Sequence, residues 1–100
     1  MEFQELIESL GFSEKEASVY LALLKRGAVS AYGVAVASGL KRPTAYVILD
    51  ELVRKGAAIL VPRTTKKLYR AVPPENLLER ARAKLERVEE ALPKIKALEK

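Results

Sequence analysis

The sequence predicts a mainly α-helical fold with one small β-hairpin, followed by a long C-terminal helix of coiled-coil type. Before residue 57, apolar residues recur at helical spacing in four separate segments. Residues 57–72 change to a strand-like pattern, and residues 73–100 return to a helix with heptad spacing. With 100 residues and no cysteine, the chain must hold this fold together through its apolar core.

The first two helices are predicted from apolar spacing and from a capping signal. A short helix is expected over Glu2–Leu10. The letters SEKE at Ser13–Glu16 match a capping box, in which a serine side chain and a glutamate three residues later satisfy each other's backbone amides. The second helix therefore begins after the serine and runs to about Arg26, where Gly27 ends it.

The next two helices are joined by a tight turn. Ser30 is predicted to cap a short helix over Ala31–Ser38, and Gly39 then supplies a turn with positive φ. The fourth helix begins at about Arg42 or Pro43, since proline is favourable in a first turn. Its apolar residues form a one-sided core stripe, made of Ala45, Ile48, Leu49, Leu52 and Val53.

Two strands are predicted over Ala58–Val61 and Lys67–Val72, joined by a polar loop that contains no glycine. Together they form a hairpin with a basic tip. Two tyrosines, Tyr20 and Tyr69, are expected in the core with their hydroxyl groups bonded to a polar partner.

The last helix opens at Pro73–Pro74 and carries an apolar seam with alternating spacings of three and four residues. This heptad pattern predicts a homodimer through the C-terminal helix. The alternative is a helix folded back on its own domain. The predicted dimerisation residues are Leu78, Ala81, Leu85, Val88, Leu92 and Ile95.

The net charge of +5 is concentrated in the middle of the chain. Residues 41–72 hold eight Lys or Arg and two Asp or Glu, whereas residues 1–40 hold three and five. A concentrated basic zone is the electrostatic footprint of a polyanion-binding surface. A solvated basic face without a partner is the alternative.

The composition argues against catalysis and metal binding. The chain has no histidine and no cysteine, which removes the commonest general base and the thiolate metal ligands. It also has no glycine-rich phosphate loop and no paired carboxylates in an apolar setting. We therefore predict no catalytic residue, no metal site, no cofactor and no enzymatic activity. The acidic N-terminus is no secretory signal, and no apolar run reaches the ~18 residues that span a bilayer, so no membrane partner is expected.

Three helices followed by a two-stranded hairpin are the layout of a winged helix-turn-helix domain. In helix-turn-helix proteins the second helix lies in the major groove with its N-terminal residues against base edges. Cations at the start of the helix can bind a phosphate or a guanine. A threonine hydroxyl can donate or accept a hydrogen bond at a base edge, and apolar side chains can contact a thymine methyl group. The predicted contacts with double-stranded DNA from this helix are Lys41, Arg42, Pro43, Thr44, Tyr46 and Val47.

The hairpin would act as the wing of this domain. Its cations, Arg63, Lys66 and Lys67, are expected to straddle the DNA backbone or to reach a minor groove. Charged hairpin tips also occur for solubility alone, which is the alternative. The chain is accordingly divided into a winged helix-turn-helix DNA-binding domain, residues 1–72, and a dimerisation helix, residues 73–100.

Two stretches carry a family resemblance, and they read LGFSEKEASVYLALLKRGAVSAYGVAVASGLKRPTAYVILDELVRKGAAILV and KKLYRAVPPENLLERA. They span about Leu10 to Arg82 and resemble the N-terminal DNA-binding domain of TrmB-type transcriptional regulators, which are sugar-responsive proteins of archaea and bacteria. The resemblance implies a winged helix that binds promoter DNA as a dimer, with its recognition helix beginning near Arg42–Pro43. It also implies a prokaryotic, cytoplasmic protein that is associated with the nucleoid when bound.

The resemblance has two departures. Full-length members of the family carry a C-terminal effector domain that binds sugars, and a chain that ends at Lys100 is expected to have none. No sugar ligand is then implied, and regulation either comes from elsewhere or the chain is a truncated or stand-alone module. The predicted wing also lacks the glycine often found at its tip in such proteins.

These observations favour a sequence-specific transcriptional regulator that binds double-stranded DNA as a homodimer. Two alternatives stay open from the residues alone. One is a winged-helix module that binds another protein, since folds of this kind also serve as scaffolds. The other is a chromatin-like DNA binder without sequence preference.

Overall fold

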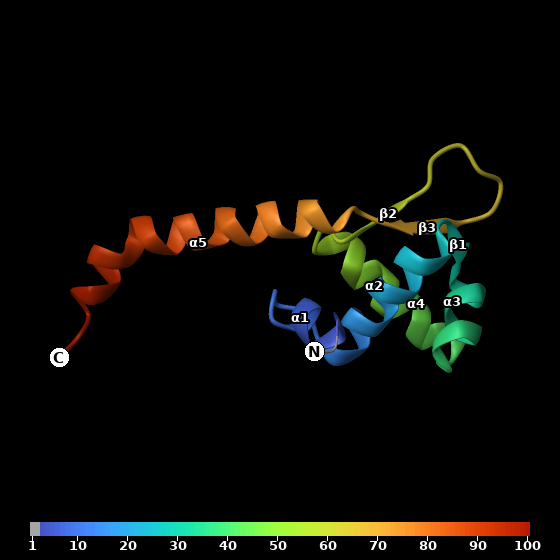
Figure 1. The fold of residues 1–100 in the computed structure, drawn as a ribbon, viewed down its shortest axis with the longest axis horizontal. Coiled ribbons are helices and arrows are strands. Elements are labelled where there is room, and N and C mark those ends of the chain that lie inside the picture. Colours follow the sequence, from blue (N-terminus) through green and yellow to red (C-terminus); the bar gives the residue numbers. More distant parts are fainter. Residues whose placement is uncertain (1–2) are drawn as a thin grey trace.

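A computed structural model describes residues 3–100, and its elements follow one another in the order helix, helix, strand, two helices, two strands, long helix (Figure 1). The helices are α1 (Phe3–Glu8), α2 (Glu14–Arg26), α3 (Ala31–Ser38), α4 (Arg42–Arg54) and α5 (Pro74–Lys96). The strands are β1 (Val29–Ser30), β2 (Ala58–Leu60) and β3 (Leu68–Ala71).

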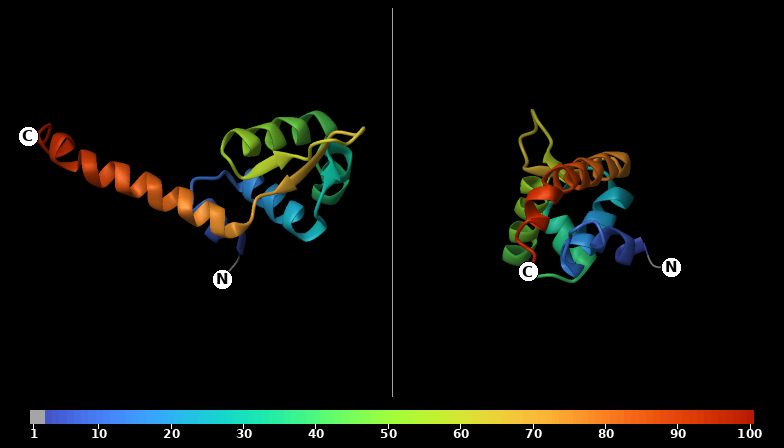
Figure 2. Two further views of the ribbon diagram at one scale, coloured as in Figure 1. Left: turned by 90° about the horizontal axis from the view of Figure 1, so that it is seen from above. Right: turned by 90° about the vertical axis from the view of Figure 1, so that its left-hand side faces the viewer.

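The molecule has a head and a stalk. Helices α1 to α4 and the three strands form the head, and α5 projects from it as a single long helix, which gives overall dimensions of 53 × 30 × 25 Å (Figures 1 and 2). The loop between β2 and β3 extends from the head at the end opposite the C-terminus (Figure 1). Within residues 3–100, no helix combines the length and the apolar character needed to cross a membrane.

The core of the head is built on α2 and α4. The predicted stripe of α4 is confirmed, because Ala45, Ile48, Leu49 and Leu52 are all buried and Val53 packs against them from a half-buried position. Tyr20 and Tyr69 are fully buried, as predicted. The Tyr20 hydroxyl donates to the Val72 carbonyl oxygen at 2.8 Å, so its polar end is satisfied inside the fold.

The predicted helix caps are confirmed. The Glu16 amide donates to Ser13 Oγ at 3.1 Å and the Ser13 amide donates to Glu16 Oε1 at 2.8 Å, which completes the capping box. Ser30 Oγ accepts from the Gly33 amide at the start of α3. The first helix is shorter than the predicted Glu2–Leu10, ending at Glu8, and Glu2 lies outside the described residues.

Glu16 also joins two helices. Lys55 Nζ, just after α4, donates to Glu16 Oε1 at 2.7 Å and to the Gly11 carbonyl oxygen at 3.1 Å. Burial alone would raise the pKa of Glu16, but the hydrogen bonds from Lys55 and Ser13 outweigh it and hold that pKa below its usual value. The ionised pair fixes the C-terminal end of α4 against the start of α2.

The sheet has one strand more than the predicted hairpin. Its order is β1-β3-β2 and both pairings are antiparallel, with Val29 opposite Tyr69 and Ala58 opposite Ala71. The two hairpin strands are also shorter than the predicted Ala58–Val61 and Lys67–Val72. The extra strand β1 has two residues, too few for an alternating pattern to be seen in the sequence.

The stalk is anchored to the head at its first turn. Leu77 is only 3% exposed and belongs to the core, whereas its neighbour Leu78 begins the exposed seam. Gly56 follows α4 with φ of 79°, and the Arg80 guanidinium group lies where a side chain at that position would be. The positive φ favours glycine at this position, whereas the Arg80 side chain is flexible and could move aside for a larger residue.

Candidate nucleic-acid interface

The turn between α3 and α4 has the geometry that a helix-turn-helix pair requires. Gly39 has φ of 64° and ψ of 26°, the left-handed conformation predicted for it. The Leu40 amide donates to the Ala35 carbonyl oxygen at 2.9 Å, which closes the end of α3. Because the turn is so short, α4 starts at Arg42 and Leu40 packs against the core between the two helices.

The first turn of α4 is open and positively charged. Lys41, Arg42 and Pro43 are exposed, and no acidic residue lies in this turn. The N-cap residue, Lys41, makes no side-chain hydrogen bond to the helix start. Among residues 3–100 the N-cap side chain thus leaves the first-turn amides uncapped, and with the positive end of the helix dipole these amides suit an anionic oxygen.

The outer face of α4 carries the other predicted contacts. Val47 is 69% exposed, so its side chain is accessible to a binding partner. Thr44 and Tyr46 are half-buried at the flanks of this face. All six predicted residues of this helix thus lie at its start or along one accessible side.

Arg42 is held by an aromatic ring that the sequence reasoning missed. Its Cζ lies 5.4 Å from the centre of the Tyr32 ring, within cation–π range. Tyr32 belongs to the first turn of α3 and is 58% exposed. The one available signal was an aromatic residue near the start of a helix otherwise made of small residues, and it did not indicate which cation the ring would meet.

The wing is joined to α4 by a lysine between two tyrosines. Lys67 Nζ lies 5.6 Å from the centre of the Tyr46 ring on α4 and 5.9 Å from that of Tyr69 on β3. The other two wing cations, Arg63 and Lys66, are exposed on the loop. Of the predicted wing residues, Lys67 is therefore the one that the structure brings against the predicted recognition helix.

The loop of the wing has internal structure despite its lack of glycine. Arg63 adopts a left-handed conformation with φ of 62°, the position at which a glycine would be most easily accommodated. The Thr64 hydroxyl donates to the carbonyl oxygen of Lys66 at 2.5 Å, with a longer contact of 3.4 Å to that of Val61. These bonds bend the loop over itself and leave the two cations on its outside.

The acidic residues of α4 are engaged with neighbouring groups. Asp50 accepts a hydrogen bond from the Tyr69 hydroxyl at 3.0 Å, and Glu51 pairs with Arg54 one turn later. Burial raises the pKa of Tyr69 to about 12, and the bond to Asp50 adds to this effect. The hydrogen bond from Arg54 lowers the pKa of Glu51. Both carboxylates lie beyond the first turn, away from the uncapped helix start.

The predicted dimerisation residues form an exposed seam along α5. Leu78, Leu85, Val88, Leu92 and Ile95 are 47–60% exposed, and Ala81 is half-buried near the head. The helix continues through Pro93 to Lys96, so the seam is helical throughout. Within residues 3–100, these five large side chains thus keep about half of their surface exposed.

The sequence of the chain is similar to that of known proteins. The chain matches the family model described as sugar-specific transcriptional regulator TrmB over residues 6–75. It is similar to the uncharacterized protein YrhO of Bacillus subtilis (strain 168), with 34% identity over 82 residues, which is 82% of this chain and 30% of YrhO.

Three solved structures are similar to the chain. TrmBL2, described as an archaeal chromatin protein with a novel mode of DNA binding, has a TM-score of 0.85 and 32% identity, and the match covers 96% of this chain and 37% of TrmBL2. The AntR antimony-specific transcriptional repressor has a TM-score of 0.56 and 23% identity, covering 88% of this chain and 78% of AntR. The MarR repressor of Listeria monocytogenes 4b F2365 has a TM-score of 0.62 and 16% identity, covering 92% of this chain and 75% of MarR.

The similarity to AntR and MarR shows the winged-helix fold alone. The match to the family model and the similarity to TrmBL2 show which family the chain belongs to. The chain spans 30% of YrhO and 37% of TrmBL2, so it corresponds to one part of each of these longer proteins. With a family match over 70 of its residues and a mostly helical fold that carries a wing and a long last helix, the chain belongs to the TrmB family of DNA-binding transcriptional regulators.

Proposed function

We propose that this chain binds double-stranded DNA as a homodimer and regulates transcription at specific sites. Each protomer would place the start of α4 in a major groove and its wing on the adjacent backbone. This role assigns the protein to the cytoplasm of a prokaryotic cell, associated with the nucleoid when bound. Residues 1–72 would bind the DNA and residues 73–100 would join the two protomers.

The uncapped, cationic first turn of α4 is the observation that carries the proposal. Two exposed cations, Lys41 and Arg42, adjoin backbone amides that have no side-chain cap and no acidic neighbour in that turn. The start of α2, by contrast, is capped by Ser13, and the start of α3 by Ser30. A phosphate oxygen would supply the missing acceptor, and the Tyr32 ring holds Arg42 beside it.

The contact between Lys67 and Tyr46 supports a joint surface of helix and wing. A lysine side chain that lies over a ring of α4 fixes the base of the wing against the helix that would enter the groove. The exposed tip cations, Arg63 and Lys66, would then contact the DNA backbone. Helix and wing would bind as one unit rather than as two independent contacts.

The seam of α5 supports the homodimer. A lone helix with five large apolar side chains about half exposed is favoured to pair with a second helix of the same heptad spacing. Two-fold symmetry would then require a pseudo-palindromic operator, with half-sites ~34–36 Å apart or a multiple of that distance.

The first test is fluorescence anisotropy of a labelled random duplex, followed by selection of a preferred sequence. If six to ten phosphates are contacted, affinity is expected to fall about 10³–10⁵-fold between ~50 and ~200 mM salt. The double variant Lys41→Gln/Arg42→Gln should weaken binding, whereas the matched control Arg87→Gln/Lys94→Gln on the exposed side of α5 should not. Equally flat curves at both salt concentrations would contradict DNA binding and favour the protein-interaction module.

A chromatin-like function is the second candidate, and the similarity to TrmBL2 favours it. That protein is described as an archaeal chromatin protein, and it shares the fold of this chain at a TM-score of 0.85. Competition separates the two functions. A regulator retains its selected duplex against a large excess of random DNA, whereas a chromatin-like binder loses it in proportion to the excess.

A further inference from the structure

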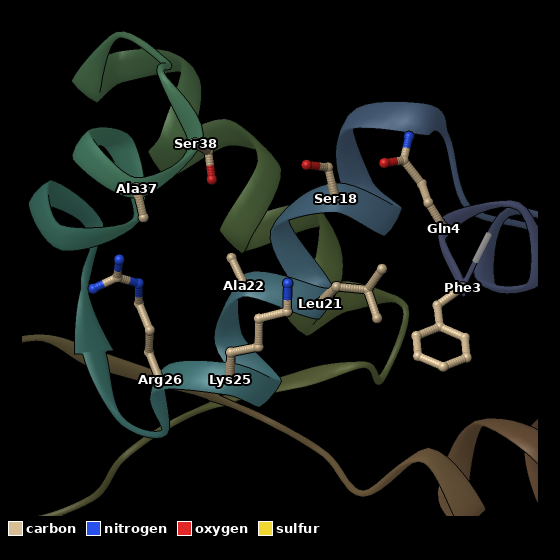
Figure 3. Close-up of a pocket in the computed structure, with 9 residues that line it drawn as sticks. All are labelled: Phe3, Gln4, Ser18, Leu21, Ala22, Lys25, Arg26, Ala37 and Ser38. Atoms are coloured by element: carbon tan, nitrogen blue, oxygen red, sulfur yellow. The ribbon is translucent and has the colours of Figure 1, made fainter.

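Helices α1, α2 and α3 line an open cleft of about 440 Å³, and none of the predicted DNA contacts is among its lining residues (Figure 3). One wall is a single face of α2, on which Ser18, Leu21, Ala22 and Lys25 recur at helical spacing. Ala37 and Ser38 at the end of α3 line it on another side, and Phe3 and Gln4 of α1 complete the lining. The cleft is thus shaped by three separate elements of the head.

The cleft is basic and contains hydroxyl groups. Lys25 and Arg26 extend toward it from the end of α2, and the hydroxyl of Ser18 points across it toward α3 (Figure 3). No carboxylate is among its lining residues. Within residues 3–100, neither Lys25 nor Arg26 takes part in an ion pair. Two cations beside one cleft, with no counter-ion among residues 3–100, favour an anion there.

Ser38 gives an independent indication of a missing partner. Its Oγ is buried and has no hydrogen-bond partner among residues 3–100, and Ser38 is one of the residues that line the cleft (Figure 3). Buried hydroxyl groups in folded proteins are nearly always bonded, so an unpartnered one needs an explanation. One change of the χ1 rotamer would turn this hydroxyl to an oxygen bound in the cleft.

The position of Ser38 connects the cleft to the turn of the helix-turn-helix. Ser38 is the last residue of α3 and is followed directly by Gly39, the left-handed residue of that turn. The cleft itself lies beside α1, and the right-hand view of Figure 2 shows α1 and α4 at opposite sides of the head. A molecule in the cleft would therefore leave the outer face of α4 free while it contacts the residue that precedes the turn.

We propose that this cleft binds a small hydroxylated organic anion, such as a phosphate monoester or a hydroxycarboxylate. Lys25 and Arg26 would pair with its charge, and Ser18 and Ser38 would bond its oxygens. The apolar walls given by Leu21, Ala22 and Ala37 would accommodate its carbon skeleton. The bound molecule would brace the end of α3 and hence the turn that sets the start of α4.

The test is NMR titration of the isotope-labelled whole chain with glycerol 3-phosphate and with citrate, at constant ionic strength. Saturable shifts of the Ser38 and Gly39 amides are expected with at least one of them, and glycerol, the uncharged match of the first probe, should give none. The variant Lys25→Gln/Arg26→Gln should weaken this binding at least tenfold. The control variant Arg87→Gln/Lys94→Gln, which removes the same charge elsewhere, should leave it unchanged.

Three results would overturn the proposal. The first is no saturable shift at Ser38 and Gly39 with either probe. The second is an affinity that the Lys25→Gln/Arg26→Gln variant retains, in a protein whose spectrum shows it to be folded. The third is a variant that binds the probes as before but loses DNA affinity and part of its salt dependence, because the two cations would then contact DNA phosphates rather than a small molecule.

Discussion

Helices α4 and α5 are both amphipathic, yet the structure uses their apolar sides differently. The stripe of α4 is buried within its own head, with Leu49 and Leu52 fully inaccessible. The seam of α5 is about half exposed beyond its first turn, and only Leu77 enters the core. An apolar stripe of globular width thus predicts a core, whereas a narrow heptad seam that residues 3–100 leave about half exposed predicts an interface with another chain.

The largest expected effect is on the α4 side of this comparison. Leu49→Ala should lower the free energy of unfolding by about 2–5 kcal/mol, because it leaves a cavity at a fully buried position. Urea denaturation followed by circular dichroism measures the change. The loss should be independent of protein concentration, since the stripe is covered by the same chain.

The matching truncation on α5 should act on association instead. Leu85→Ala removes two leucine side chains from a dimer, and at ~1.5 kcal/mol each it should weaken the dimer by roughly 100-fold. Sedimentation equilibrium gives the dissociation constant, with Glu86→Ala on the same turn as control. If Leu85→Ala instead lowers the stability of a monomer as much as Leu49→Ala does, the seam packs on its own head and the comparison fails.

Arg42→Ala tests whether the outer face of α4 serves DNA binding while its buried stripe serves stability. We expect specific DNA affinity to fall by about 1–3 kcal/mol, as for a lost arginine contact to a base. Thermal stability should change by less than about 0.5 kcal/mol, since Arg42 is exposed and its contact within the chain is the Tyr32 ring. A large drop in melting temperature would show that Arg42 is structural. Tyr32→Ala should reproduce part of the affinity loss but add little to Arg42→Ala.

The last prediction concerns alkaline pH, because the two buried tyrosines lose their protons at a higher pH than tyrosines of the unfolded chain. Burial raises the pKa of Tyr69 and of Tyr20 from 10.0 to about 12, with contributions from Asp50 and Glu75 respectively. Unfolded tyrosines lose their protons near pH 10, so the stability gained from the neutral hydroxyls is complete below that pH and is lost as the pH rises toward about 12. Denaturation curves between about pH 9 and 11.5 measure this slope. Tyr69→Phe should make it shallower, and an unchanged slope would mean that Tyr69 does not contribute.

Local signals in the sequence predicted most of the fold. The caps at Ser13 and Ser30, the left-handed Gly39 and the start of α4 all depend on residues close together along the chain, so short-range physics is sufficient for them. The long last helix followed from its heptad spacing in the same way. The winged-helix layout could be inferred because the order of these elements is itself distinctive.

The sequence did not predict what depends on distant partners. Strand β1 exists because Val29 and Ser30 pair with β3 about 40 residues later, and no two-residue stretch predicts that by itself. The same holds for Tyr32, whose importance comes from the position of Arg42, and for the contact of Lys67 with Tyr46. For the candidate site, the sequence therefore predicted which residues take part, but only the structure shows which of them contact one another.

The burial of Leu77 has a mechanical consequence. Because its side chain is buried in the head at the first turn of α5, the packing at this end sets the direction of the whole helix. A helix of 23 residues is about 35 Å long, so a tilt of ~10° at its base would displace its far end by about 6 Å. In a dimer that pairs along α5, the distance between the two DNA-binding heads would therefore depend on how Leu77 packs, although its buried side chain would contact neither the DNA nor the second chain.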